Sequence, residues 1–316
     1  MSKKILTIII ALILVVLTIY LFNIKRPWSS LTKIQQPSKT ANENNNKINS
    51  GTILKDITYK TVNNEEIKLD IYAPTKYKYK KSPVIIYIHG GGWSYGDKAL
   101  DNNVSPIIDK IREEGLFIIS INYRLTSKSI KFPSPVEDCK DAIRWVYKHA
   151  ENYNFDKNNI GLWGVSAGAH LALLCAYTSN KDFIGDEALS TCDTKVKYVI
   201  DFFGPTSLSL QTTKDGRAMV ESLINTNSRE VEDLLKKASP LTYITPSAPP
   251  TLIVHGEKDT LVPILQSKLL YDKGRELGVK IDFLSIPKAE HNLANAQYID
   301  LFKILNSTLN FIKDNT

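Results

Sequence analysis

The sequence predicts an α/β domain over residues 51–316, built on a mainly parallel, twisted sheet flanked by helices. Short continuous apolar runs such as "PVIIYIHG" and "LFIISINY" are typical of strands buried on both faces. These runs alternate along the chain with longer segments of helical spacing. The chain has 316 residues, of which 43% are hydrophobic, so it can bury one large core.

Two segments at the start of this domain show the alternation of half-buried strands. "TILKDITYKT" and "IKLDIYAP" flank a turn at Asn63-Asn64 and predict an antiparallel pair. The rest of the domain keeps a strand–helix rhythm. We expect, in chain order, strands at "PVIIYIHG" and "LFIISINY", a helix at 135–151, a strand at "IGLWGV", a helix at 167–178, strands at "VKYVIDFFG" and "TLIVHG", a helix at 263–277, a strand at "VKIDFLSIP" and a helix at 297–313.

One polar and partly helical stretch, residues 206–245, interrupts that rhythm. We interpret it as a small cap insertion over one end of the sheet. In the helix at 135–151, Pro135 suits the first turn because it has no backbone N–H to leave unpaired there.

The N-terminus predicts a membrane anchor. Ile5 to Phe22 is an 18-residue apolar run, which as a helix spans about 27 Å, enough to cross a bilayer core. No small-residue cleavage site follows it, so an uncleaved anchor is favoured over a signal peptide, which stays the alternative. The expected divisions are a stub at 1–4, a transmembrane segment at 5–22, an Asn-rich polar tether at 23–50 and the folded α/β domain at 51–316.

The short stub favours a single-pass topology with the N-terminus inside and the folded domain outside the cytoplasm. After signal cleavage the domain would instead be secreted. Most of the formal charge of +7 belongs to the tail, because residues 1–50 hold seven basic residues and one acid. The main domain is nearly neutral and gives no reason to expect nucleic-acid binding.

The three cysteines show no spacing typical of a metal site, and no metal is expected. Sparse cysteine does not suggest a disulfide scaffold, although a Cys139–Cys192 bridge stays an alternative. Cys175 lies in an apolar helical run and is interpreted as a small core residue.

Ser166 stands between Gly164 and Gly168, where an expected strand passes into an expected helix. Glycines allow a tight turn at this junction, and the turn would present the serine hydroxyl at the carboxyl end of a strand. The alternative is a simple connection that only needs small residues.

A second glycine-rich turn favours chemistry. "HGGGW", His89 to Trp93, follows a buried strand, and its backbone N–H groups can approach a substrate. With the N–H of Ala167 they would form an oxyanion hole, which stabilises negative charge in a transition state.

A serine nucleophile needs a base, and the base needs an orienting carboxylate. Asp259 in "HGEKDTLVP" and His291 in "PKAEHN" each follow an expected strand, and the order Ser166, Asp259, His291 is the one typical of this arrangement. Glu257 and Glu290 are weaker alternatives for the acid. The other histidines are interpreted as structural: His89 and His255 hold loops, and His149 and His170 pack on helices.

These motifs resemble the α/β-hydrolase superfamily, and within it the carboxylesterases of the hormone-sensitive-lipase type and the bacterial feruloyl and acetylxylan esterase-like group. The resemblance rests on "HGGGWSYGDK", "SINYRL", "FPSPVEDCKDAIRWV", "IGLWGVSAGAHLA", "FFGPTSL", "HGEKDTLVP" and "EHN", which span nearly the whole domain. It implies an α/β-hydrolase fold, Ser166 as nucleophile, His291 as general base and then acid, and Asp259 as its orienter. It also implies oxyanion N–H groups from Gly91, Gly92 and Ala167, and no cofactor.

The sequence departs from that pattern at Val165, where these esterases often have an acidic or polar residue, and at Ala169, where they often have glycine. Neither change removes a catalytic group. Trp93, Tyr95 and Tyr123 are candidates for a substrate pocket, with core packing as the alternative.

The function predicted is that of a membrane-anchored serine carboxylic-ester hydrolase acting through an acyl-enzyme on a small or medium acyl ester, either a small molecule or borne on a polymer. An exopeptidase or amidase with the same triad is one alternative. A non-catalytic binding module on a hydrolase scaffold is the other, and the complete triad argues against it.

Overall fold

The computed structural model describes residues 48–100, 104–211 and 213–316. The expected membrane segment at 5–22 and nearly all of the tether lie outside these residues. Within the described part of the chain, no helix is both long and apolar enough to span a bilayer.

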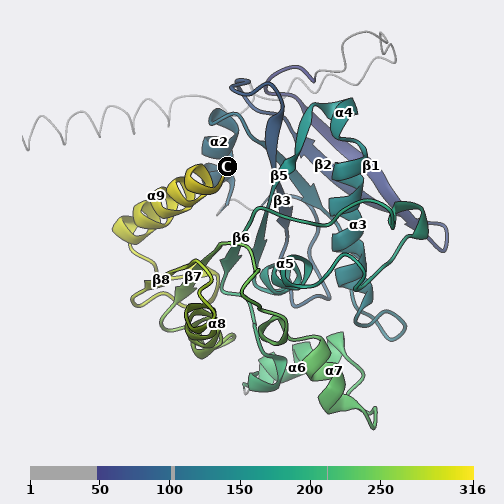
Figure 1. The fold of residues 1–316 in the computed structure, drawn as a ribbon. Coiled ribbons are helices and arrows are strands. Elements are labelled where there is room, and N and C mark those ends of the chain that lie inside the picture. The colour runs from purple at the N-terminus through teal and green to yellow at the C-terminus, as the bar shows by residue number, and fades with distance from the viewer. Residues whose placement is uncertain (1–47, 101–103, 212) are drawn as a thin grey trace, which may run out of the picture. The chain divides into compact units, whose positions relative to one another are not determined.

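The described chain forms an eight-stranded sheet with helices on both faces (Figure 1). The strand order is β1-β2-β4-β3-β5-β6-β7-β8. The first two pairings, β1 with β2 and β2 with β4, are antiparallel, and the remaining strands run parallel. The strands are β1 (Ile53–Val62), β2 (Glu65–Tyr72), β3 (Ser82–Ile88), β4 (Phe117–Ile121), β5 (Phe155–Val165), β6 (Tyr198–Phe202), β7 (Thr251–Gly256) and β8 (Ile281–Ile286).

The α-helices also follow the expected order, with α2 and α4 as additions. They are α2 (Ser105–Glu113), α3 (Ser134–Lys148), α4 (Ala150–Tyr153), α5 (Ala167–Tyr177), α6 (Lys214–Leu223), α7 (Val231–Lys237), α8 (Leu265–Glu276) and α9 (Tyr298–Asn315). The sequence pattern did not predict α2, or α4 as a separate helix. The helices α6 and α7 form the insertion expected at 206–245, and Figure 1 shows them together at one end of the domain.

The sheet separates two apolar cores. Along β3, Val84, Ile86 and Ile88 belong to one core and Ile85 and Tyr87 to the other, because successive side chains of a strand point to opposite faces. The first core includes residues of α3 and α5, and the second includes residues of α2 and α9. Burial on both faces explains why the central strands read as continuous apolar runs.

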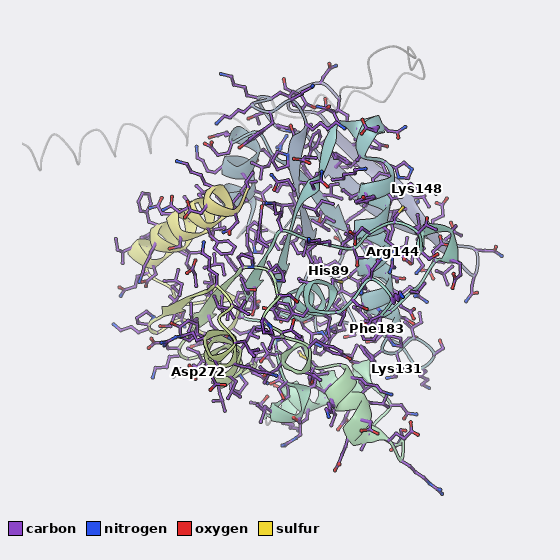
Figure 2. The ribbon with its side chains drawn as sticks, in the orientation of Figure 1. His89, Lys131, Arg144, Lys148, Phe183 and Asp272 are labelled. Atoms are coloured by element: carbon purple, nitrogen blue, oxygen red, sulfur yellow. The ribbon has the colours of Figure 1, made fainter. Side chains whose placement is uncertain are left out.

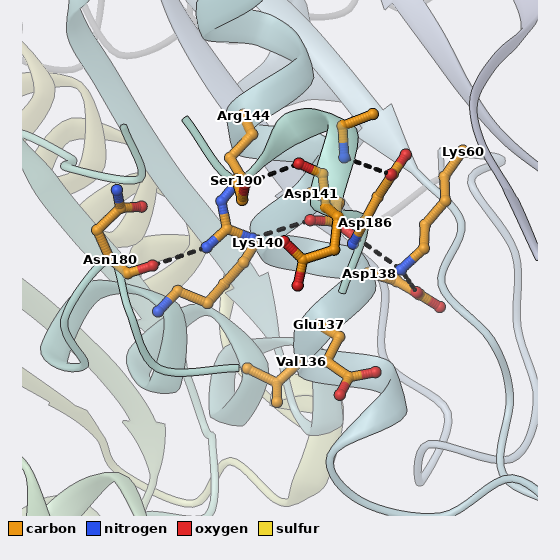
Figure 3. Close-up of polar contacts among 12 residues, drawn as sticks. Lys60, Val136, Glu137, Asp138, Lys140, Asp141, Arg144, Asn180, Asp186 and Ser190 are labelled. Carbon is orange, nitrogen blue, oxygen red and sulfur yellow. Dashed lines mark hydrogen bonds and ion pairs between the residues drawn. The ribbon is translucent and has the colours of Figure 1, made fainter. Parts of the chain in front are cut away.

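A buried ion cluster fixes α3 to the edge of the sheet (Figure 3). Lys60 on β1 pairs with Asp138 and with Asp141, each at 2.7 Å. Arg144 pairs with Asp141 at 2.9 Å and donates a second bond to the backbone oxygen of Asn180. Buried charges are costly unless they are paired, so each member depends on the others. The cluster joins segments distant in sequence and was not predicted.

Asp201 is a buried carboxyl in the middle of the parallel sheet. Its Oδ1 accepts the Gly204 N–H at 2.8 Å, whereas Oδ2 has no hydrogen-bond partner among the described residues. Burial raises the pKa of Asp201 from 3.8 to about 7, although the Gly204 N–H and the nearby His255 favour the charged form.

This raised pKa predicts a pH dependence of stability. The folded state holds the Asp201 proton more tightly than the unfolded state, so the stabilisation is complete below about pH 4 and is lost as the pH rises through about 7. The unfolding free energy of the wild type should therefore contain a decline of roughly 2–3 kcal/mol between pH 5 and pH 8 that is due to Asp201. This part of the decline should be absent in Asp201→Asn. Urea titrations at both pH values measure it. Asp272→Asn, at an exposed position on α8 labelled in Figure 2, is the control and should leave the decline intact. An equal decline in wild type and Asp201→Asn would contradict this assignment.

Candidate active site

Ser166 lies in the turn between β5 and α5, with the unusual backbone angles φ 53° and ψ −119°. Its backbone N–H donates to the Phe202 oxygen of the neighbouring strand at 2.8 Å. A Cβ on Gly164 would lie 2.3 Å from the Gly168 oxygen, and one on Gly168 would lie 2.1 Å from the Ile88 oxygen. Both glycines are therefore required by backbone contacts, and the turn they permit holds the serine at the carboxyl end of β5.

His291 faces Ser166 from the loop after β8. Its Nε2 lies 3.0 Å from Ser166 Oγ, and its Nδ1 lies 2.7 Å from Asp259 Oδ2. The carboxylate can only accept, so Nδ1 carries the proton and Nε2 is left to receive one from the serine. The His291 ring also packs edge-on against Phe203, with ring centroids 5.0 Å apart.

Asp259 is held as a charged carboxylate by its surroundings. Its Oδ1 accepts the backbone N–H groups of Leu261 at 2.9 Å and Val262 at 2.8 Å. Burial by itself would raise the pKa of Asp259, but the hydrogen bonds from His255, His291 and Val262 outweigh it and hold that pKa well below its usual range. The alternatives Glu257 and Glu290 bond elsewhere, to Ser285 and Asn295.

His255 makes a contact with this carboxylate that the sequence did not reveal. Its Nε2 lies 2.8 Å from the Val262 oxygen and 3.2 Å from Asp259 Oδ2. Both are acceptors, so Nε2 carries a proton, and Nδ1 makes a hydrogen bond with the Ser267 hydroxyl at 2.7 Å. His255 holds its loop, as expected, and also touches the acid. The four-residue spacing in "HGEKD" is the only sequence signal for that contact.

The glycine-rich loop after β3 approaches the serine turn. A Cβ on Gly90 would lie 3.0 Å from the Val165 oxygen, which is a tight contact, and 3.4 Å from Ser166 Cβ. Gly91 and Gly92 have φ of 109° and 53°. Within the described ranges, no hydrogen bond engages the backbone N–H of Gly91, Gly92 or Ala167. The structure thus has unpaired donors on both sides of Ser166, in the two segments expected to form an oxyanion hole.

The three aromatic pocket candidates differ in exposure. Trp93 is 2% exposed and donates its indole N–H to His170, and Tyr123 is 3% exposed and donates to the His89 oxygen at 3.2 Å. Their burial favours the packing alternative. Tyr95 is 60% exposed and is the only one of the three at the surface. His89, labelled in Figure 2, stacks on Tyr123 with ring centroids 4.4 Å apart.

The remaining candidates have structural surroundings. Cys139, Cys175 and Cys192 are free thiols, so no Cys139–Cys192 disulfide is present. His149 makes a hydrogen bond to the Trp145 backbone oxygen at 2.8 Å, and its ring stacks on the Trp145 indole. Across residues 48–100, 104–211 and 213–316, no cluster of His, Cys, Asp or Glu has the composition of a metal site.

Comparison with known proteins links this geometry to esterases. Esterase LipQ of Mycobacterium tuberculosis is 32% identical over 242 residues, covering 75% of this chain and 56% of LipQ. Esterase LipC of the same organism is 27% identical over 228 residues, covering 71% of this chain and 56% of LipC. The chain spans about half the length of the curated relatives it matches.

Solved structures with the same fold align over more of their length. A truncated carbohydrate esterase from gut microbiota aligns with a TM-score of 0.70 and 25% identity, over 84% of this chain and 97% of that one. Butyrate-bound esterase 2 of Thermogutta terrifontis aligns with a TM-score of 0.68 and 27% identity, over 82% and 93%.

The family itself is identified by a match to the BD-FAE family over residues 69–273. That range begins in β2 and ends within α8, so it contains the serine turn, the glycine-rich loop and Asp259. The chain therefore belongs to the BD-FAE family, among the carboxylesterase-type α/β-hydrolases.

Proposed function

We propose that this protein is a membrane-anchored serine carboxylic-ester hydrolase that works through an acyl-enzyme. The observation that carries the proposal is the hydrogen-bonded series Asp259–His291–Ser166, with 2.7 Å and 3.0 Å between successive polar atoms. A serine on a strand-to-helix turn beside free backbone donors is the arrangement that acyl transfer requires.

The first step is attack on the ester carbonyl carbon. Ser166 Oγ bonds to that carbon while its proton passes to His291 Nε2. Ionised Asp259 stabilises the imidazolium that forms, and its bonds to Leu261 and Val262 keep it oriented. The carbonyl oxygen becomes an anion, and the N–H groups of Gly91, Gly92 and Ala167 would stabilise it.

The second half of the reaction releases both products. His291 returns its proton to the departing alkoxide, and the alcohol leaves an acyl group on Ser166 Oγ. Water then attacks this ester, with His291 again taking a proton and finally returning it to Ser166. No step needs a group beyond the residues named and a water molecule.

The relatives support a substrate ester with a small acyl group, and they are compatible with an alcohol part that belongs to a polymer. Thermogutta terrifontis esterase 2 has been solved with butyrate and with propionate, and another relative is a carbohydrate esterase. The apolar segment 5–22 would keep the catalytic domain at the outer face of the membrane, on a 28-residue tether. Acyl groups on polysaccharide, wall polymer or lipid fit that location.

Ser166→Ala should abolish turnover of p-nitrophenyl acetate, by about 10⁴-fold or more, because no other group can form the acyl-enzyme. Its melting temperature should match wild type, since only the hydroxyl is lost. Ser209→Ala, which changes an exposed serine, is the matched control and should retain full activity. Initial rates and thermal melts measure both. Turnover that survives in Ser166→Ala would exclude this serine. If the protein hydrolyses an alanyl p-nitroanilide and does not hydrolyse any ester, the protein is an amidase and the esterase proposal is wrong.

Asp259→Asn should lower kcat by about 10³–10⁴-fold while KM stays within a few fold. The amide would donate toward His291 Nδ1 and favour the tautomer that cannot accept the Ser166 proton. Steady-state kinetics on p-nitrophenyl acetate measure it, with Glu257→Gln as the matched control. A larger loss of kcat in Glu257→Gln than in Asp259→Asn would contradict the proposal and identify Glu257 as the acid.

Membrane anchoring predicts the behaviour of the full-length protein in cell fractions. The protein should stay in the membrane pellet after alkaline carbonate extraction, because 18 consecutive mostly apolar residues insert stably. Deletion of residues 1–22 should release it. Intact mass of the recovered protein separates an anchor from a cleaved signal, and a soluble protein with its N-terminus retained would contradict anchoring.

A further inference from the structure

His170 occupies a special position that the catalytic scheme above does not use. It lies one helical turn after Ser166 on α5, and its backbone N–H donates to the Ser166 oxygen at 3.1 Å. Its side chain is completely buried. The sequence suggested only a packing role, yet both ring nitrogens have polar partners.

The partners of His170 determine its protonation. The indole N–H of Trp93 can only donate, and it lies 3.1 Å from Nδ1, so Nδ1 must accept. The backbone oxygen of Ala238 can only accept, and it lies 2.6 Å from Nε2, so Nε2 must carry the proton. The ring is therefore neutral. Burial supports this, because it lowers the pKa of His170 to about 4 in spite of the Ala238 oxygen.

Trp93 ends the glycine-rich loop that carries the oxyanion donors. It has φ of 62°, directly after Gly91 and Gly92, so three successive residues occupy left-handed backbone space. A non-glycine residue keeps that conformation only when its surroundings hold it. The Trp93 ring is buried edge-on against His170, with centroids 5.1 Å apart.

Ala238 belongs to the insertion, directly after α7, and it is fully buried. One imidazole thus links three segments: the helix that follows the nucleophile, the loop with the oxyanion donors, and the insertion. In Figure 1, α6 and α7 lie below α5 in the view.

We propose that neutral His170 is a positioning residue, which sets the N–H groups of Gly91 and Gly92 relative to Ser166 by holding Trp93. This inference rests on the proposed esterase function. A shift of these donors would weaken stabilisation of the transition state more than binding of the ester, since the negative charge develops only in the transition state.

Two substitutions of His170 separate its two hydrogen bonds. The Asn amide oxygen can take the position of Nδ1 and still accept from Trp93, whereas the Gln amide nitrogen can take the position of Nε2 and still donate to Ala238. His170→Asn should keep kcat within about fivefold of wild type. His170→Gln should lower kcat by about 10–100-fold with KM nearly unchanged, a part of the 10²–10³-fold loss that follows removal of an oxyanion donor.

Trp93→Phe provides a second variant, which removes the indole N–H together with part of the buried ring and keeps an aromatic side chain at this position. It should lower kcat to a similar extent, and the double variant Trp93→Phe/His170→Gln should lose no more than either alone, because both break the same bond. The matched control is His149→Gln, which alters another helix-end histidine that contacts a tryptophan, Trp145, and should leave kcat unchanged.

Steady-state kinetics on p-nitrophenyl acetate with full-length proteins measure all these variants. Melting temperatures that fall while kcat stays within twofold in His170→Gln and Trp93→Phe would overturn the positioning role and leave a packing role. If the positioning role is overturned in this way, the proposed function still holds as long as the wild type hydrolyses the ester and Ser166→Ala does not. A wild type without ester turnover would overturn both.

Discussion

The turn at Ser166 is the constraint on which the rest of the site depends. Gly164 and Gly168 cannot carry side chains, because backbone oxygens fill the space that a Cβ would need. The contact of Gly168 with Ile88 packs the start of α5 against the end of β3, and the Ser166 N–H joins the turn to β6. A single turn thus fixes the serine relative to three parallel strands before any other site residue is considered.

Charge at the site is arranged around Asp259. This carboxylate accepts two backbone N–H groups and contacts two histidines, so its ionised form is stabilised in a buried place. It fixes the proton of His291 on Nδ1, and that leaves Nε2 free toward Ser166. Backbone oxygens that can only accept likewise place a proton on Nε2 of His255 and of His170. The same principle therefore orders the catalytic and the supporting histidines.

Much of this architecture could be predicted from the sequence because strong local patterns carry it. Strands buried on both faces give continuous apolar runs, and the turn at Asn63-Asn64 has the positive φ angles that asparagine tolerates. The sequence also predicted one catalytic set, because each of its members follows the end of an expected strand: Ser166, Asp259 and His291. The BD-FAE match and the solved relatives bear out the fold and the enzyme class.

Contacts between distant segments that no local motif marks could not be predicted. Lys60 and Asp138 are 78 residues apart, and nothing in either local pattern indicates a buried pair. Trp93 and His170 are 77 residues apart in the sequence, and no local pattern indicates their hydrogen bond. Without that bond, the Trp93 ring could equally line a pocket or pack in the core. The helix α2 is a different case, because its amphipathic pattern, with Ile107, Ile108 and Ile111 on the buried face, is a local signal that could have predicted it.

Covalent labelling tests the central claim most directly, because an organophosphate reports the activated serine without assuming a natural ester. Thermogutta terrifontis esterase 2 has been solved phosphorylated by paraoxon. Treatment of the full-length protein with paraoxon, followed by intact-mass analysis and peptide mapping, should show a single diethylphosphoryl group on Ser166, with release of p-nitrophenolate and no label in Ser166→Ala. A folded protein that takes no label, or takes it at another residue, would contradict the account.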